Sequence, residues 1–155
     1  MSRLPILLLA LSASLPAVAA DAGHQHRHGR PAEHRKPLLL NAEEAAQLRL
    51  EMRVFLSAVH KIVTGAANND MKVVAEAAQS AGMAAAHDVP AGLRQKLPPE
   101  FKRLGHATHT GFDDLARDAA SMADPSLGLK QLGQLMSNCV SCHATFRIEP
   151  SPRKP

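Results

Sequence analysis

Apolar residues recur every three or four positions in four separate stretches of this chain, and no stretch alternates between apolar and polar residues. The first stretch spans residues 41–65, and its apolar stripe lies on one helical face. The others span residues 70–86, 99–122 and 125–146. Four helices with mostly short connections predict an all-α fold, and specifically an antiparallel four-helix bundle.

Local signals mark where these helices begin and end. Asn41 is followed three residues later by Glu44, which completes a capping box, and Gly65 is suited to end the first helix. Pro99 is tolerated in the first turn of the third helix. The stretch "HDVPAGLRQKLPP", residues 87–99, contains three prolines and a glycine, and we expect it to be a loose connection.

The first twenty residues have the layout of a secretory signal. "MSRLPILLLALSASLPAVAA" has Arg3 near its start, then a short apolar run, then small residues resembling a cleavage site. An uncleaved anchor is the alternative, but the apolar run is too short to span a bilayer. We therefore expect residues 1–20 to be removed, a periplasmic location, and no integral membrane segment in the mature protein.

Two further segments look unstructured. Residues 21–40 are polar and histidine-rich, and residues 150–155 contain three prolines, so neither can bury enough apolar surface to fold alone. Four histidines at positions 24, 26, 28 and 34 could bind a metal ion, but a solvated linker is the preferred interpretation. One domain remains, residues 41–149.

The charge distribution argues against nucleic acid as a partner. Residues 41–149 contain eleven Lys and Arg against twelve Asp and Glu, a net charge of −1, although the whole chain carries +4. A nucleic-acid-binding domain would place its basic residues on the folded body.

The only two cysteines lie in "CVSCH", residues 139–143, at the end of the fourth predicted helix. A redox-active pair would be expected at a helix N-terminus after a strand, where the helix dipole lowers the thiol pKa. A structural zinc site needs four ligands, and a disulfide here would close a very small loop. The spacing C-x-x-C-H is instead the signature of covalent haem attachment, in which both thiols form thioethers and the histidine binds the iron. We therefore expect one haem c per chain, held by Cys139, Cys142 and His143.

The chain resembles the class II cytochromes c, the cytochrome c′-like family, and most closely its low-spin branch with His and Met as iron ligands. The resemblance covers residues 41–149 and rests on "CVSCH" near the C-terminus, on Phe146-Arg147 just after it, and on a Met or Leu facing the haem from the first helix. It implies that the first helix faces the iron. A homodimer is expected from this resemblance alone.

The resemblance implies that Met52 is the sixth ligand of the iron, because the related electron-transfer branch carries Met on this helix. Met52 lies on the apolar stripe of the first helix, and a thioether suits an electron carrier. Simple packing is the alternative. Arg147 follows the motif by one turn and could neutralise a haem propionate, or simply favour a helix C-terminus. Met83, His106 and His109 are weaker candidates, each more readily explained by packing or by a surface position.

These features predict an exported single-haem electron carrier rather than an enzyme, with a redox partner that the sequence does not identify. The alternative is a five-coordinate cytochrome that binds NO or CO, which would follow if Met52 does not bind the iron. A third hypothesis is metal handling by the histidine-rich segment.

Overall fold

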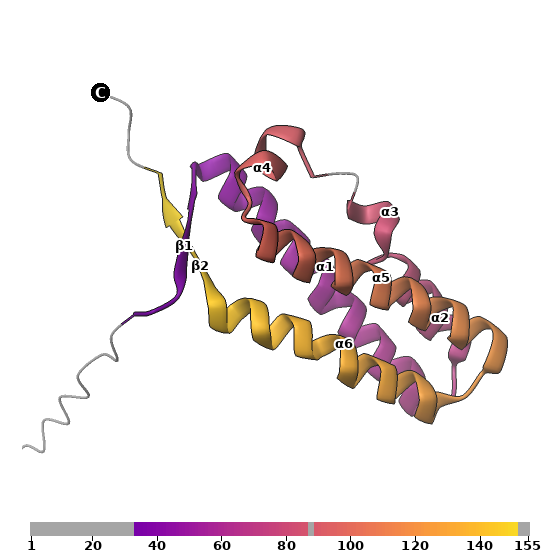
Figure 1. The fold of residues 1–155 in the computed structure, drawn as a ribbon. Helices are drawn as coiled ribbons and strands as arrows, with labels where there is room; N and C mark the ends of the chain where they lie inside the picture. Colours follow the sequence, from indigo (N-terminus) through magenta and orange to yellow (C-terminus); the bar gives the residue numbers. More distant parts are fainter. Residues whose placement is uncertain (1–32, 87–88, 152–155) are drawn as a thin grey trace, which may run out of the picture. The chain divides into compact units, whose positions relative to one another are not determined.

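The computed structural model describes residues 33–86 and 89–151, and this part of the chain is mostly helical, in agreement with the all-α prediction (Figure 1). The predicted signal and most of the histidine-rich segment lie outside the described residues. The four longest helices are α1 (Ala42–Ala67), α2 (Met71–Gln79), α5 (Pro99–Met122) and α6 (Pro125–Thr145). The shorter elements are α3 (Met83–Ala86), α4 (Ala91–Lys96) and the strands β1 (Lys36–Leu40) and β2 (Phe146–Pro150).

Side-chain caps fix the starts of three helices. At α1 the predicted capping box is confirmed: the Asn41 side chain accepts a hydrogen bond from the backbone N–H of Glu44 at 2.8 Å, and the Glu44 carboxylate accepts one from the N–H of Asn41 at 3.0 Å. Asp70 caps α2, and Asp124 caps α6 by accepting from the N–H of Ser126 at 2.8 Å. The predicted bounds of the third helix are those of α5.

The prediction of one helix over residues 70–86 is wrong, because α2 ends at Gln79 and α3 begins at Met83. A residue of α5 stabilises this break between the two helices. Asp113 accepts a hydrogen bond from the N–H of Met83 at 3.0 Å, and a side chain at Gly82 would collide with that carboxylate. The expected loose connection over residues 87–99 also contains a helix, α4, which buries Leu93.

The two strands are a second correction. β1 pairs in parallel with β2, with Lys36 opposite Phe146 and Leu40 opposite Pro150. Residues 36–40 are therefore not part of an unstructured linker, and the folded body begins before residue 41. The physical reason is burial: Leu38 and Leu40 point inward and are buried, while Leu39 between them is exposed.

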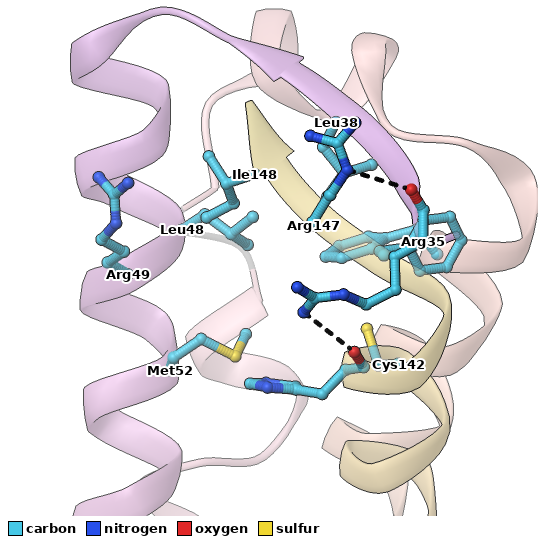
Figure 2. A pocket seen from close by; sticks show the side chains of 11 residues that line it. Arg35, Leu38, Leu48, Arg49, Met52, Cys142, Arg147 and Ile148 are labelled. Carbon is cyan, nitrogen blue, oxygen red and sulfur yellow. Dashed lines mark hydrogen bonds between the residues drawn. The ribbon is translucent and has the colours of Figure 1, made fainter. Parts of the chain in front are cut away.

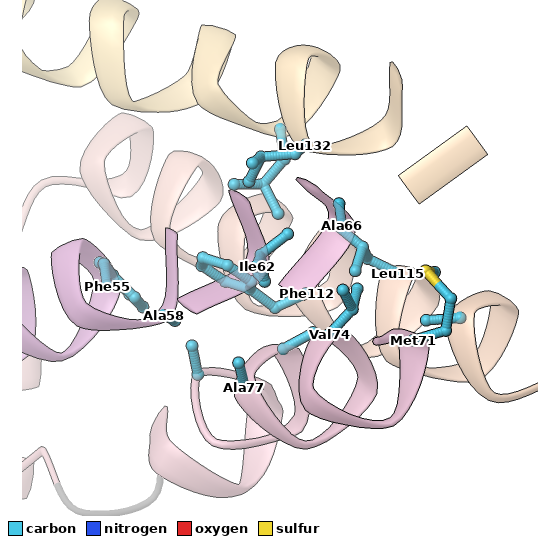
Figure 3. Packing of buried hydrophobic residues seen from close by; sticks show 14 residues of the cluster. Phe55, Ala58, Ile62, Ala66, Met71, Val74, Ala77, Phe112, Leu115 and Leu132 are labelled. Atoms are coloured by element: carbon cyan, nitrogen blue, oxygen red, sulfur yellow. The ribbon is translucent and has the colours of Figure 1, made fainter. Parts of the chain in front are cut away.

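The four long helices contact one another in the cyclic order α1, α2, α5, α6. Their shared core is an apolar cluster that includes Ile62, Val74, Phe112 and Leu115, all almost fully buried (Figure 3). A second cluster lies where β1 packs on the helices, and it contains both inward leucines of β1 together with Leu48, Leu93, Leu97, Phe101, Leu104 and Phe146. Met52 packs against both clusters. Among the described helices, none is both long and apolar enough to cross a membrane.

Candidate functional site

The C-x-x-C-H motif occupies the last turns of α6, as predicted. Cys139 and Cys142 are free thiols, each partly buried, and His143 is exposed two residues before the helix ends at Thr145. Immediately after this end the chain becomes β2, with Phe146 buried against Phe101 of α5 at a ring-centroid distance of 5.5 Å. The motif therefore lies at the end of α6, directly before the strand pair.

A cavity of about 310 Å³ opens beside the motif, between α1, α6 and the strands (Figure 2). It brings together four of the five residues that the sequence singled out, namely Met52, Cys142, His143 and Arg147. Met52 extends from α1 and Cys142 lies on the opposite wall, on α6 (Figure 2). Cys139, one turn earlier on α6, is outside the lining. The remaining lining residues are Arg35, Leu38, Leu48, Arg49, Phe101, Phe146 and Ile148.

The walls of this cavity are apolar, and its charged groups are all basic. Arg35, Arg49 and Arg147 line it, and no Asp or Glu does. Arg35 Nη1 donates to the carbonyl oxygen of His143 at 3.4 Å, and Arg147 Nε donates to the carbonyl oxygen of Arg35 at 3.2 Å. The Arg35 guanidinium also pairs with Glu33, and that of Arg147 pairs with Glu149 of β2, whereas Arg49 has no ion pair within residues 33–86 and 89–151. The cavity is thus suited to an apolar group that carries negative charge.

The two thiols are not activated for redox exchange. Burial raises the pKa of Cys139. The pKa of Cys142 is also raised, mainly by burial and secondly by the charge of the neighbouring Cys139. They lie at the C-terminal end of α6, where the helix dipole disfavours a thiolate. Since a thioredoxin-like pair needs a lowered thiol pKa, the site does not have the electrostatics of a disulfide oxidoreductase.

The weaker candidates lie elsewhere. None of Met83, His106 and His109 lines the cavity. His109 is buried in the core, where Nδ1 lies 2.9 Å from the Ala81 carbonyl oxygen and Nε2 lies 3.1 Å from the Glu51 carboxylate. Over the described ranges, no three His, Cys, Asp or Glu side chains gather closely enough to hold a metal ion.

Sequence reasoning missed the contribution of the N-terminal strand. Arg35 and Leu38 belong to a segment predicted to be an unstructured linker, yet both line the cavity. The available signal was the run of three leucines, residues 38–40, directly before the cap of the first helix. Phe101 and Ile148 were also not assigned to the site, because nothing local in the sequence relates them to α1.

Comparisons with known proteins place no family name on this site: no protein-family model, no curated protein and no solved structure matches the chain.

Proposed function

We propose that the chain is an exported c-type cytochrome, an antiparallel four-helix bundle of the cytochrome c′-like kind, which carries electrons in the periplasm with one covalently bound haem c. One observation carries the proposal: Cys142 and His143 of the attachment motif share a cavity with Met52 of α1. The motif alone predicts haem attachment. The cavity adds the sulfur atom of Met52, which comes from a helix far away in the sequence. Together they fit an iron with His and Met ligands.

The motif and the cavity together contain the kinds of donor that would hold a haem. The Cys139 and Cys142 thiols would form the two thioethers. The His143 imidazole and the Met52 sulfur would be the axial ligands. Arg35, Arg49 and Arg147 would pair with the propionates, since guanidinium groups bind carboxylates through paired hydrogen bonds. When bound, the haem supplies reversible one-electron chemistry.

The rest of the cavity supports a carrier rather than an enzyme. Leu38, Leu48, Phe101 and Phe146 are buried side chains that line the walls. An apolar shell of this kind excludes water and tunes the potential of the iron through burial.

The proposal is tested by expressing the full chain in cells that export and attach haem. The purified protein should begin near Asp21, its intact mass should exceed that of the mature polypeptide by one haem, and Cys139→Ser or Cys142→Ser should remove one covalent link. A protein with unmodified thiols after such expression would refute the proposal.

Absorption spectra of the oxidised and reduced protein then separate the carrier from the gas-binding alternative. Met52→Ala should convert a low-spin spectrum to a high-spin one and open the iron to CO. Met83→Ala is the matched control, because Met83 is partly buried on α3 and does not line the cavity. A wild-type protein that is already high-spin and binds CO readily would replace the carrier proposal with the gas-binding one.

A further inference from the structure

Two rows of exposed apolar side chains run away from the cavity, one on α1 and one on α6. On α1 the row is Leu56 and Val63, and on α6 it is Leu129, Met136 and Val140. Leu56 and Val140 are the most exposed, at 69% each. A group of exposed apolar side chains commonly marks an interaction site. We refer to these five residues as the α1/α6 face.

Helix geometry shows that the two rows border the same seam. Leu56 follows Met52 by four residues and Val63 follows by eleven, so all three share one side of α1. On α6, Val140 and Met136 precede His143 by three and seven residues and share its side. Met52 and His143 line one cavity, and α1 is in contact with α6. The two rows therefore lie on either side of the line where α1 meets α6, on the same side of each helix as the cavity.

The charges beside this face have one sign. From residue 52 to the end of α1 there is no Asp or Glu, and α6 contains none at all. Arg49 and Arg53 share the side of α1 that carries Leu56, at helical steps of four and three. By contrast, α5, which packs against α6, carries Asp113, Asp114 and Asp118.

We propose that the α1/α6 face is the docking surface for an acidic electron-transfer protein, whose own apolar centre covers the two rows and whose carboxylates meet the arginines of α1. The inference rests on the proposed carrier function. Charge complementarity selects this occupant over a second copy of the chain, because two copies paired by a twofold axis would bring the same arginines toward one another. The position next to the cavity also brings the partner close to the motif.

The test measures binding of oxidised flavodoxin, an acidic flavin protein, to the haem-loaded chain. With both proteins oxidised no electron is transferred, so the readout is association alone. Methyl NMR signals of Leu56, Leu129, Met136 and Val140 should shift during titration, and raising the salt concentration should weaken binding. Shifts confined to other methyl groups would overturn the proposal.

Matched variants locate the contact. Arg53→Glu should weaken binding roughly three- to tenfold at low salt, since it replaces an attraction of an exposed pair by a repulsion. Arg103→Glu makes the same change at an exposed site of α5 and should leave binding unchanged. Leu56→Ser should weaken binding, whereas Leu50→Ser should not, because Leu50 is also exposed on α1 but lies about 120° around the helix.

Three results would contradict the docking surface while leaving the carrier function intact. One is that Arg53→Glu and Arg103→Glu, or Leu56→Ser and Leu50→Ser, weaken flavodoxin binding equally. Another is a Leu56→Ser protein whose haem spectrum changes but whose flavodoxin binding does not, which would make the row a wall of the haem site. The last is a concentration-dependent dimer in sedimentation that Leu56→Ser abolishes. Failure of the carrier function is seen separately, as a missing haem or a high-spin spectrum before any flavodoxin is added.

Discussion

Two adjacent leucines in β1 offer a direct test of the fold around the cavity. Leu40 is 2% exposed and belongs to the cluster that contains Leu48, Phe101 and Phe146, whereas Leu39 is 49% exposed. Replacing each by Ala removes the same atoms from neighbouring positions in one strand. The two variants therefore differ only in what the side chain contacts.

The expected losses follow from burial. A buried Leu→Ala change costs about 2–5 kcal/mol of unfolding free energy, depending on how far the surroundings collapse into the space. Leu40 lies in a two-stranded element at one end of the domain, where collapse is easy, so we expect Leu40→Ala to cost about 2–3 kcal/mol. Leu39 gains little from folding, and Leu39→Ala should cost less than about 1 kcal/mol.

Urea unfolding of the haem-loaded chain, followed by circular dichroism at fixed pH, measures both values. The midpoint should fall clearly for Leu40→Ala and slightly for Leu39→Ala, while the slope with urea stays constant. Two small and equal losses would refute the reasoning, because residues 36–40 would then behave as the linker that their composition predicts. Equal large losses would mean that the strand register differs from the one described.

Other predictions concern the turn between α2 and α3 and its contacts with α5 and α1. Gly82→Ala should cost about 1–3 kcal/mol of unfolding free energy, because the new methyl group displaces Asp113. Gly92→Ala in α4, where nothing lies within 4 Å of the new methyl group, should be neutral or stabilising by up to about 1 kcal/mol. Urea midpoints measure both changes, and a neutral Gly82→Ala would contradict the described packing. Burial lowers the pKa of His109, but the hydrogen bonds to Glu51 and to the backbone outweigh this and raise it overall. His109 should therefore stabilise the fold relative to a His109→Gln variant, fully below about pH 6.5 and less as pH rises through the raised pKa. Urea titrations of both proteins measure this difference in unfolding free energy. A difference that stays constant from pH 5 to pH 9 would contradict the prediction.

The helices were predictable because their signals are local. The capping box of Asn41 and Glu44, and the prolines at 99 and 125, each act within one turn, and α1, α5 and α6 begin where these residues indicate. The break after α2 was not predictable in this way. It depends on Asp113, which lies 30 residues away from its partner Met83.

The strand pair was hidden for a related reason. Its two strands are separated by the whole helical part of the chain, and parallel pairing of distant segments leaves no local signature. Leucines occupy three successive positions in β1, so the alternation between buried and exposed sites cannot be read from residue type. At the site, the motif and Met52 could be identified from spacing, but Arg35 could not, because its position follows from the strand.

The register of this strand pair connects the packing to the chemistry of the cavity. Successive side chains in a strand point to opposite faces, so a slip of one residue would turn Leu39 inward and Leu38 and Leu40 outward. The same slip would move Arg35 away from the carbonyl oxygen of His143. Burial of two leucines therefore selects the register that places a guanidinium group at the cavity. It follows that β1 supplies part of the site, and that its apolar contacts help to place Arg35 at the cavity.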